Sequence, residues 1–248
     1  MINCHAEIKK IKNNTQFTIA LAGNPNVGKS TIFNQLTGLG AVTANYPGKT
    51  VCLNIGSAEF NGISFGLIDL PGAYSVGAVS EDQFIARRAI LEKNAEIIVA
   101  VIDATNLARN LYLTLQLIEF GYPLVVALNL IDITAKQNLL IDAKKLGERL
   151  GVPVIPIVAT TGEGIDELIK TCINIADKSQ PINPPVPKYS EEIFRLVQGL
   201  NEIIKNNLPS LPYGIRAEAL AILLLEEDEE FINYLKSDKI TGAAIEKI

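Results

Sequence analysis

The stretch GNPNVGKST, residues 23–31, has residue types and a spacing that can hold phosphates. It fits the pattern G-x-x-x-x-G-K-[ST] and lies between the apolar run FTIALA and a segment of helical periodicity. Glycines let successive backbone N–H groups point at phosphate oxygens, and the following helix N-terminus adds partial positive charge. We expect Lys29 to reach the β- and γ-phosphates of a nucleotide and the Ser30 hydroxyl to bind Mg²⁺. An ordinary strand–turn–helix is the alternative for this motif alone.

A second candidate motif, Asp69-Leu70-Pro71-Gly72, ends the predicted strand GLIDL. Ligands of open α/β sheets bind at the carboxyl ends of strands. We therefore expect the Asp69 carboxylate to hold Mg²⁺ through water and the Gly72 N–H to meet a γ-phosphate. Taken alone, this motif is equally compatible with a plain turn.

Two further motifs suit the recognition of a base. Asn129-Leu130-Ile131-Asp132 ends the strand PLVVALN, and Val158-Ala159-Thr160 follows VPVIPI. The Asp132 carboxylate can accept both N–H donors on the N1–N2 edge of guanine, a pair that adenine lacks. The Ala159 N–H is expected to reach guanine O6. Each motif is weak alone, but four in this order at strand ends predict a P-loop GTPase domain.

The elements that must position these motifs alternate between strands and helices. Apolar runs of strand length are followed by segments of helical period, which predicts a mostly parallel sheet with helices on both faces. Asn61-Gly62, between VCLNIGSAEF and ISFGLIDL, predicts a hairpin and a single antiparallel edge strand. We expect an α/β, Ras-like sheet of six strands. Predicted strands lie at 17–22, 96–104, 123–129 and 152–158, and predicted helices at 29–38, 80–93, 109–121, 139–150 and 163–178.

The sequence beyond this pattern changes character at PINPPVPKYS, residues 181–190, where four prolines fall within ten residues. Only helical periodicity follows, and the segment 181–248 holds 7 basic and 11 acidic residues. We expect an N-terminal lead at 1–16, a nucleotide-binding domain at 17–180 and a small helical domain at 181–248.

Composition excludes several classes of protein. The formal charge is −5, from 22 Lys and Arg against 27 Asp and Glu, so the surface gives no electrostatic case for nucleic acid. Three cysteines without CxxC spacing argue against a disulfide framework and fit a reducing cytosol. No apolar run has the length of a membrane span or a signal peptide. We expect this chain, taken alone, to be soluble.

The chain resembles the ferrous iron transport protein B (FeoB) family over roughly residues 17–176. The likeness rests on GNPNVGKSTIFNQLTG, NYPGKTV, DLPGAYS, SEDQFIARRAIL and above all VIDATNLARNLYLTLQLIEFG followed by VVALN. The resemblance implies a Mg²⁺-dependent GTPase at the cytoplasmic face of the membrane. It also implies a helical (GDI-like) domain that affects GDP release, a transport domain for Fe²⁺ that this chain lacks, and possible homo-oligomers.

The resemblance also implies individual roles. Thr50 in NYPGKTV becomes the switch threonine that binds Mg²⁺, with a first switch at 39–51 and a second at 72–81. Asn26 matches an asparagine that helps bind K⁺, which would neutralise developing charge as an arginine finger does elsewhere. The alternative for Asn26 is a local hydrogen bond that shapes the loop. The expected catalytic residues are Lys29, Thr50, Gly72 and Asn26, and the metal ligands are Ser30, Thr50 and Asp69 for Mg²⁺ and Asn26 for K⁺. The expected nucleotide-binding residues are Gly23, Asn24, Pro25, Asn26, Val27, Gly28, Lys29, Ser30, Thr31, Gly48, Lys49, Thr50, Asp69, Leu70, Pro71, Gly72, Asn129, Leu130, Asp132, Val158, Ala159 and Thr160.

Three positions depart from common GTPase patterns. Ala73 stands where Ras-like enzymes carry a water-orienting glutamine, so intrinsic turnover is expected to be slow. Leu130 replaces a lysine whose stem covers the base in many GTPases, which implies modest affinity. Val158 replaces a serine hydroxyl, so relaxed base selectivity with some use of ATP is expected.

Two alternative functions stay open from the sequence. One is a regulatory module that a partner reads only in the GTP state, with incidental turnover. The other is an RNA- or ribosome-associated GTPase, which the acidic helical segment disfavours.

Overall fold

The computed structural model describes residues 4–38, 41–46, 52–77, 80–92, 94–177, 189–208 and 210–237. Its contacts divide the chain into two compact units. The first comprises Met1–Leu117 and Tyr122–Pro185, and the second comprises Ile118–Gly121 and Val186–Ile248. The predicted boundary at residue 181 lies outside the described residues, so 181 stays our proposal for the start of the helical domain.

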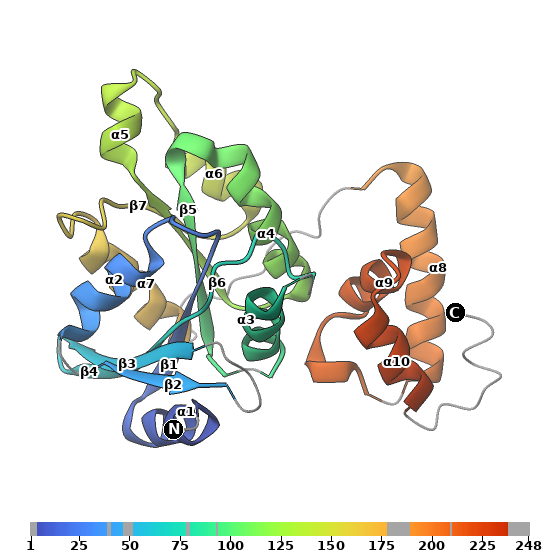
Figure 1. Cartoon of the computed structure of the whole chain (residues 1–248). Coiled ribbons are helices and arrows are strands. Elements are labelled where there is room, and N and C mark those ends of the chain that lie inside the picture. The colour runs from blue at the N-terminus through green and yellow to red at the C-terminus, as the bar shows by residue number, and fades with distance from the viewer. Residues whose placement is uncertain are drawn as a thin grey trace. The chain divides into compact units, whose positions relative to one another are not determined.

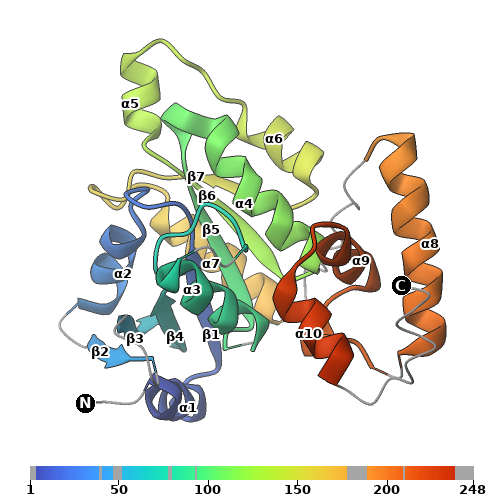
Figure 2. The same ribbon diagram turned by 45° about the vertical axis from the view of Figure 1, so that its right-hand side comes forward.

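The first unit is built on one twisted sheet with the strand order β2-β3-β4-β1-β5-β6-β7 (Figures 1 and 2). Five of the strands form parallel pairs: β1 pairs with β4 and with β5, β5 pairs with β6, and β6 pairs with β7. This parallel arrangement confirms the predicted α/β class. The strand bounds are β1 (Phe17–Ala22), β2 (Val42–Asn45), β3 (Cys52–Phe60), β4 (Ile63–Asp69), β5 (Ile97–Asp103), β6 (Leu124–Asn129) and β7 (Val154–Pro156).

The prediction of six strands and a single antiparallel edge strand was wrong by one strand. The seventh, β2, pairs antiparallel with β3, which is itself antiparallel to β4. Only four residues long, β2 has one fully buried residue, Ala44, so it carries no apolar run that sequence reasoning can detect. It falls inside the segment predicted as the first switch.

The predicted hairpin is confirmed at Asn61-Gly62. Both residues have positive φ angles, 52° and 79°, as the two central residues of a type I′ turn require. This turn fixes the register of β3 against β4 and places Asn54 opposite Asp69. A side chain from β3 thereby reaches the end of β4.

Helices cover both faces of the sheet, so every residue of β1 and β6 and all of β5 except its last residue, Asp103, are buried. Ile32 and Phe33 of α2 and Leu168 of α7 pack with Ile19 and neighbours in one core. Figures 1 and 2 show α3 and α4 on the opposite side of the sheet from α7. The helices before residue 178 are α1 (Cys4–Asn14), α2 (Lys29–Thr37), α3 (Glu81–Leu91), η2 (Ala104–Asn106), α4 (Leu107–Phe120), α5 (Ile131–Lys136), α6 (Ala143–Leu150) and α7 (Ile165–Ala176).

Two of these α-helices, and the 3₁₀ turn η2, were not predicted. The segment taken as an N-terminal lead forms α1, which buries Cys4 and Ile8. The short helix α5 follows Leu130, whose left-handed φ of 66° turns the chain out of β6. Both are short or weakly apolar, so hydrophobic periodicity does not reveal them.

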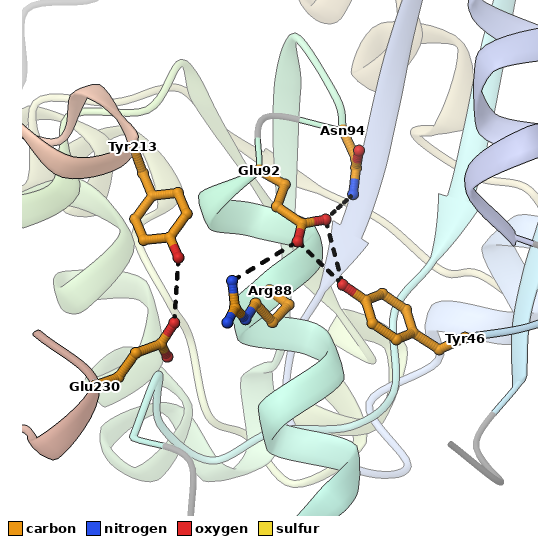
Figure 3. A network of polar contacts seen from close by, with 6 residues as sticks. All are labelled: Tyr46, Arg88, Glu92, Asn94, Tyr213 and Glu230. Atoms are coloured by element: carbon orange, nitrogen blue, oxygen red, sulfur yellow. Dashed lines mark hydrogen bonds and ion pairs between the residues drawn. The ribbon is translucent and has the colours of Figure 1, made fainter. Parts of the chain in front are cut away.

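The second unit is helical, with α8 (Glu191–Asn207), η3 (Pro212–Gly214), α9 (Ala217–Leu225) and α10 (Glu229–Ser237). Ile204, Leu220 and Phe231 are fully buried within it. The Tyr213 hydroxyl donates to Glu230 at 3.3 Å (Figure 3), which ties η3 to α10. At its start, the Tyr189 hydroxyl donates to the Glu119 carboxylate.

No helix within the described ranges is both long enough and apolar enough to cross a membrane.

Candidate nucleotide-binding site

The four predicted motifs meet at the carboxyl edge of the sheet. The loop after β1 holds the glycine-rich motif, and the segment that begins at Leu70 follows β4. The base-side motifs follow β6 and β7. Because β1, β4, β5, β6 and β7 are parallel, their loops leave the sheet at the same edge. The topology alone therefore brings these segments together.

Glycine is required at both ends of the loop that follows β1. Gly23 has a φ of 153°, and a Cβ there would lie 2.3 Å from the Val101 carbonyl oxygen. Gly28 has a φ of 99°, and a Cβ there would lie 2.3 Å from Nδ2 of Asn129. A side chain at either position would collide with the neighbouring strand end or its amide, so the two glycines set the path of the loop.

Lys29 lies within this loop rather than in solvent. Its Nζ donates to the carbonyl oxygens of Gly23 at 3.0 Å and Asn24 at 2.9 Å, and the residue is 7% exposed. Burial lowers the pKa of the Lys29 ammonium, and the negative charge of Asp69 opposes that shift. An anion placed in the loop would favour the charged ammonium, because it adds a second opposite charge.

Ser30 and Asp69 form the closest polar contact between two of the motifs. The Ser30 hydroxyl donates to Oδ2 of Asp69 at 2.7 Å. Asn54 donates to the same oxygen at 3.4 Å. The other carboxylate oxygen, Oδ1, is buried and has no hydrogen-bond partner among the described residues. The Ser30 hydroxyl oxygen and the Asp69 carboxylate, with its unbonded Oδ1, are oxygen ligands of the kind that Mg²⁺ prefers.

Sequence reasoning missed Asn54 as part of this group. The signal that points to it is the Asn61-Gly62 turn, since a two-residue hairpin fixes the register and places residue 54 opposite residue 69. The Asn54 amide donates to the Asp69 carboxylate and accepts from the Thr43 hydroxyl at 3.1 Å, so it helps to orient that carboxylate.

The segment after Asp69 lies directly against the glycine-rich loop. A Cβ at Gly72 would come within 2.8 Å of the Pro25 Cα, so only glycine permits this approach. The Ala73 N–H donates to the Gly23 carbonyl oxygen at 3.1 Å. The start of the predicted second switch is thus joined to the glycine-rich loop by backbone atoms.

On the base side, Asn129 joins three loops. Its Nδ2 donates to the Val27 carbonyl oxygen at 2.9 Å, and its Oδ1 accepts from the Ala159 N–H at 3.0 Å. Asn129 is 1% exposed, so both bonds are shielded from water. We call these two hydrogen bonds the Asn129 clamp. The Ala159 N–H is bonded to Asn129 in this structure, and its expected contact with guanine O6 stays a prediction.

The remaining base-side residues surround this clamp. Asp132 is part-exposed in the first turn of α5, with Lys136 at 3.6 Å from its carboxylate. The Val158 N–H donates to the Glu163 carbonyl oxygen at 3.0 Å, and its side chain is buried. Thr160 is exposed beside it. The structure therefore leaves the Asp132 carboxylate and Thr160 accessible.

The two asparagines of the glycine-rich loop differ. Asn26 is exposed, has a left-handed φ of 64°, and forms no hydrogen bond with any residue that the structure describes. Asn24 is 3% exposed, and its Nδ2 donates to the Arg109 carbonyl oxygen at 3.5 Å. The amide of Asn26 is thus available to a ligand, while that of Asn24 faces α4.

Gly48, Lys49 and Thr50 lie outside the described residues, as does most of the predicted first switch. The described residue before that gap, Tyr46, is held firmly. Its hydroxyl contacts both carboxylate oxygens of Glu92 at 3.2 Å (Figure 3). Arg88 at 3.9 Å and Asn94 at 3.4 Å hold the same carboxylate. Burial and the Glu92 charge raise the pKa of the Tyr46 phenol, so it stays a hydrogen-bond donor at neutral pH.

Comparison with known proteins gives a consistent result. A family model described as ferrous iron transport protein B matches residues 17–172. The Fe(2+) transport protein A/Fe(2+) transporter FeoB fusion protein of Porphyromonas gingivalis is 38% identical over 92% of this chain and 27% of its own length. The Fe(2+) transporter FeoB of Escherichia coli K12 is 41% identical over 78% of this chain and 25% of its length. The chain thus spans about a quarter of these relatives.

Solved structures agree over most of the chain. An S. thermophilus NFeoB mutant bound to GDP superposes with a TM-score of 0.80 at 36% identity, covering 93% of this chain and 87% of that one. The cytosolic domain of the T. maritima FeoB iron transporter in its GMPPNP form gives 0.82 at 32% identity, covering 93% and 92%.

Proposed function

We propose, from the premise that this chain belongs to the ferrous iron transport protein B family, that it binds GTP and GDP and hydrolyses GTP. The observation that carries the proposal is the contact between Ser30 and Asp69, 2.7 Å long, beside the buried ammonium of Lys29. This contact joins two motifs 39 residues apart at a glycine loop shaped for phosphates. Relatives crystallised with GDP and GMPPNP support the same assignment.

The phosphate half of the proposed site uses residues of the chain in separate roles. Backbone N–H groups from residues 26–31 cradle the phosphates, and Lys29 exchanges its loop carbonyl partners for β- and γ-phosphate oxygens. Ser30, Asp69 and, in the first switch, Thr50 hold Mg²⁺. Mg²⁺ supplies charge neutralisation between the two phosphates when it is bound. The Gly72 N–H donates to the γ-phosphate.

The reaction proposed is the addition of water across the β–γ phosphoanhydride bond, which gives GDP and inorganic phosphate. Ala73 has no polar side chain to orient that water, so backbone groups of the second switch and of the first switch hold it. We expect slow intrinsic turnover for this reason. Asn26 would hold K⁺ through its amide oxygen, and K⁺ would supply positive charge that offsets the negative charge developing on the phosphates.

The base half of the proposed site selects guanine through Asp132. Its carboxylate accepts from N1 and N2 of guanine, and Asn129 fixes the loop from which α5 begins. Val158 contributes no hydroxyl, so we expect discrimination against ATP to be incomplete. The chain's partner, in this proposal, is the Fe²⁺ transport domain of a longer protein at the cytoplasmic face of the membrane.

The experiment for this proposal is GTP hydrolysis by the wild type and by Asn26→Ala in KCl and in NaCl, each with Mg²⁺. Potassium activation of about tenfold or more that is absent from the variant is the expected result. Hydrolysis that is equal in the two salts removes K⁺ from the mechanism. Negligible hydrolysis in both salts, with GDP still bound, favours the regulatory module that a partner reads in the GTP state.

A further inference from the structure

The second switch is anchored through its backbone at Ala73 and at Val76, and Tyr74 and Ser75 lie between these two points. At one end, the Ala73 N–H donates to Gly23 in the phosphate loop. At the other, the Val76 N–H donates to Oε1 of Gln116 at 2.8 Å, and Arg87 donates to the Val76 carbonyl at 3.4 Å. Tyr74 lies between these anchors and is 41% exposed.

Arg109 provides the contact that holds this side chain. Its guanidinium carbon lies 4.4 Å from the centroid of the Tyr74 ring, which is the geometry of a cation–π stack. The Arg109 carbonyl oxygen accepts from Asn24 of the phosphate loop at 3.5 Å. One residue of α4 therefore contacts the phosphate loop through its backbone and the second switch through its side chain.

The spacing along α4 explains why one helix supplies two of these contacts. Arg109 and Gln116 are seven residues apart, which is two helical turns, so they lie on the same face. Both contact the second switch, at Tyr74 and at Val76. The segment VIDATNLARNLYLTLQLIEFG holds no nucleotide-binding motif, but it supplies the two side chains that contact the second switch.

We propose that Arg109 is a positioning residue for GTP hydrolysis: its stack on Tyr74 holds the second switch so that the Gly72 N–H and the Ala73 backbone face the γ-phosphate and the attacking water. The kinetic part of this inference rests on the proposed function, and the structural part stands without it. Arg109 touches neither nucleotide nor water in this proposal, so its loss slows the reaction and leaves GDP affinity unchanged.

The structural part is testable because the chain contains no tryptophan. Tyr74→Trp introduces a single tryptophan, which is excited selectively at about 295 nm. It retains an aromatic face for Arg109. Acrylamide quenching of this Trp is measured with Arg109 present, with Arg109→Ala, and with Arg149→Ala, which removes an exposed arginine from α6. We expect Arg109→Ala to raise the acrylamide quenching constant of this Trp about two- to fivefold, and Arg149→Ala to leave the constant unchanged.

The kinetic part uses single-turnover GTP hydrolysis and equilibrium GDP binding on the chain without the Trp. Arg109→Ala is expected to lower the rate about two- to fivefold at constant GDP affinity. Arg109→Lys, which keeps the charge and loses the planar stack, is expected to recover part of the rate. Arg149→Ala is expected to match the wild type.

Each outcome decides one part. Trp quenching that does not change on Arg109→Ala overturns the proposal, whether or not the chain hydrolyses GTP. Increased quenching with an unchanged hydrolysis rate, or with GDP affinity lost in step with the rate, overturns the positioning role. If no protein in the series hydrolyses GTP, the proposed function fails, and the quenching comparison still tests the stack.

Discussion

The base side of the site and the second switch are held in different ways. On the base side, one buried amide, that of Asn129, binds the backbone of two loops, which follow β1 and β7. The second switch is held at Tyr74 and Val76 by side chains of helices, with partly exposed groups. The hydrogen bonds of Asn129 are costly to break because water cannot replace them in the interior. The contacts at Tyr74 and Val76 are partly exposed, so water can replace them at a lower cost. We infer that the base side sets nucleotide affinity and the second switch sets the rate of hydrolysis.

The largest effect is expected from Asn129→Ala, which breaks the base side. It leaves the Val27 carbonyl and the Ala159 N–H buried without partners, at a cost of about 1–3 kcal/mol each. We expect GDP affinity to fall about tenfold or more and Tm to fall by about 5 °C or more. Fluorescent GDP titration and thermal unfolding measure the two effects.

Asn129→Asp is the matched variant for this test. It keeps an oxygen that accepts from Ala159 but sets a buried carboxylate against the Val27 carbonyl oxygen, so a loss of affinity at least as large as that of Asn129→Ala is expected. Full GDP affinity in Asn129→Ala would show that the clamp does not position the base loops.

An intermediate effect is expected from Gln116→Ala, which releases the second switch. The Val76 N–H loses its acceptor, and a hydrogen bond of this kind contributes about 0.5–1.5 kcal/mol. We expect single-turnover GTP hydrolysis to slow about threefold to tenfold with GDP affinity unchanged. Gln116→Glu keeps the acceptor oxygen and is expected to restore the rate. If Gln116→Ala lowered GDP affinity as much as the hydrolysis rate, the inference that the second switch sets the rate and not the affinity would be wrong.

The smallest effect is expected from Glu119→Gln, which lies in the second unit and serves as a reference for both regions. Burial raises the pKa of the Glu119 carboxyl, the Tyr189 hydroxyl partly offsets this, and Glu226 adds to it. A carboxyl whose pKa is higher in the folded state destabilises the fold above that pKa, and the wild type gains stability as pH falls through it. The amide keeps an acceptor for Tyr189.

We therefore expect Glu119→Gln to raise Tm by about 1 °C at pH 8, with the difference vanishing as pH falls below the ordinary carboxyl value of 4.5. Thermal unfolding across this pH range measures it. GDP affinity and hydrolysis should match the wild type throughout. A variant less stable than the wild type at pH 8 would contradict the direction of the shift.

The sequence predicts much of this arrangement because the strong signals are local. Apolar runs located β1, β5 and β6, and Asn61-Gly62 fixed the hairpin that carries Asp69. The glycine motif predicted a loop whose two terminal glycines leave no room for side chains. Each of these features depends on a few neighbouring residues, so tertiary structure does not override it.

The features that escaped prediction depend on distant parts of the chain. The strand β2 pairs only with β3 among the described strands and also contacts α1, and α1 packs without a strong apolar face. The spacing of Arg109 and Gln116 places them on one helical face, but the sequence does not say that this face meets the second switch. Contacts of this kind follow from the placement of α4 beside the loop after β4, which only the folded chain determines.

The central claim is that four loops at one sheet edge form a site for a guanine nucleotide. Equilibrium binding of GDP and of ADP to the wild type and to Asp132→Ala, each with Mg²⁺, tests it most directly. We predict that GDP binds about tenfold or more tightly than ADP and that Asp132→Ala removes the preference while leaving the binding of ADP unchanged. Equal binding of GDP and ADP by the wild type, or a preference for GDP that survives in Asp132→Ala, would contradict the account.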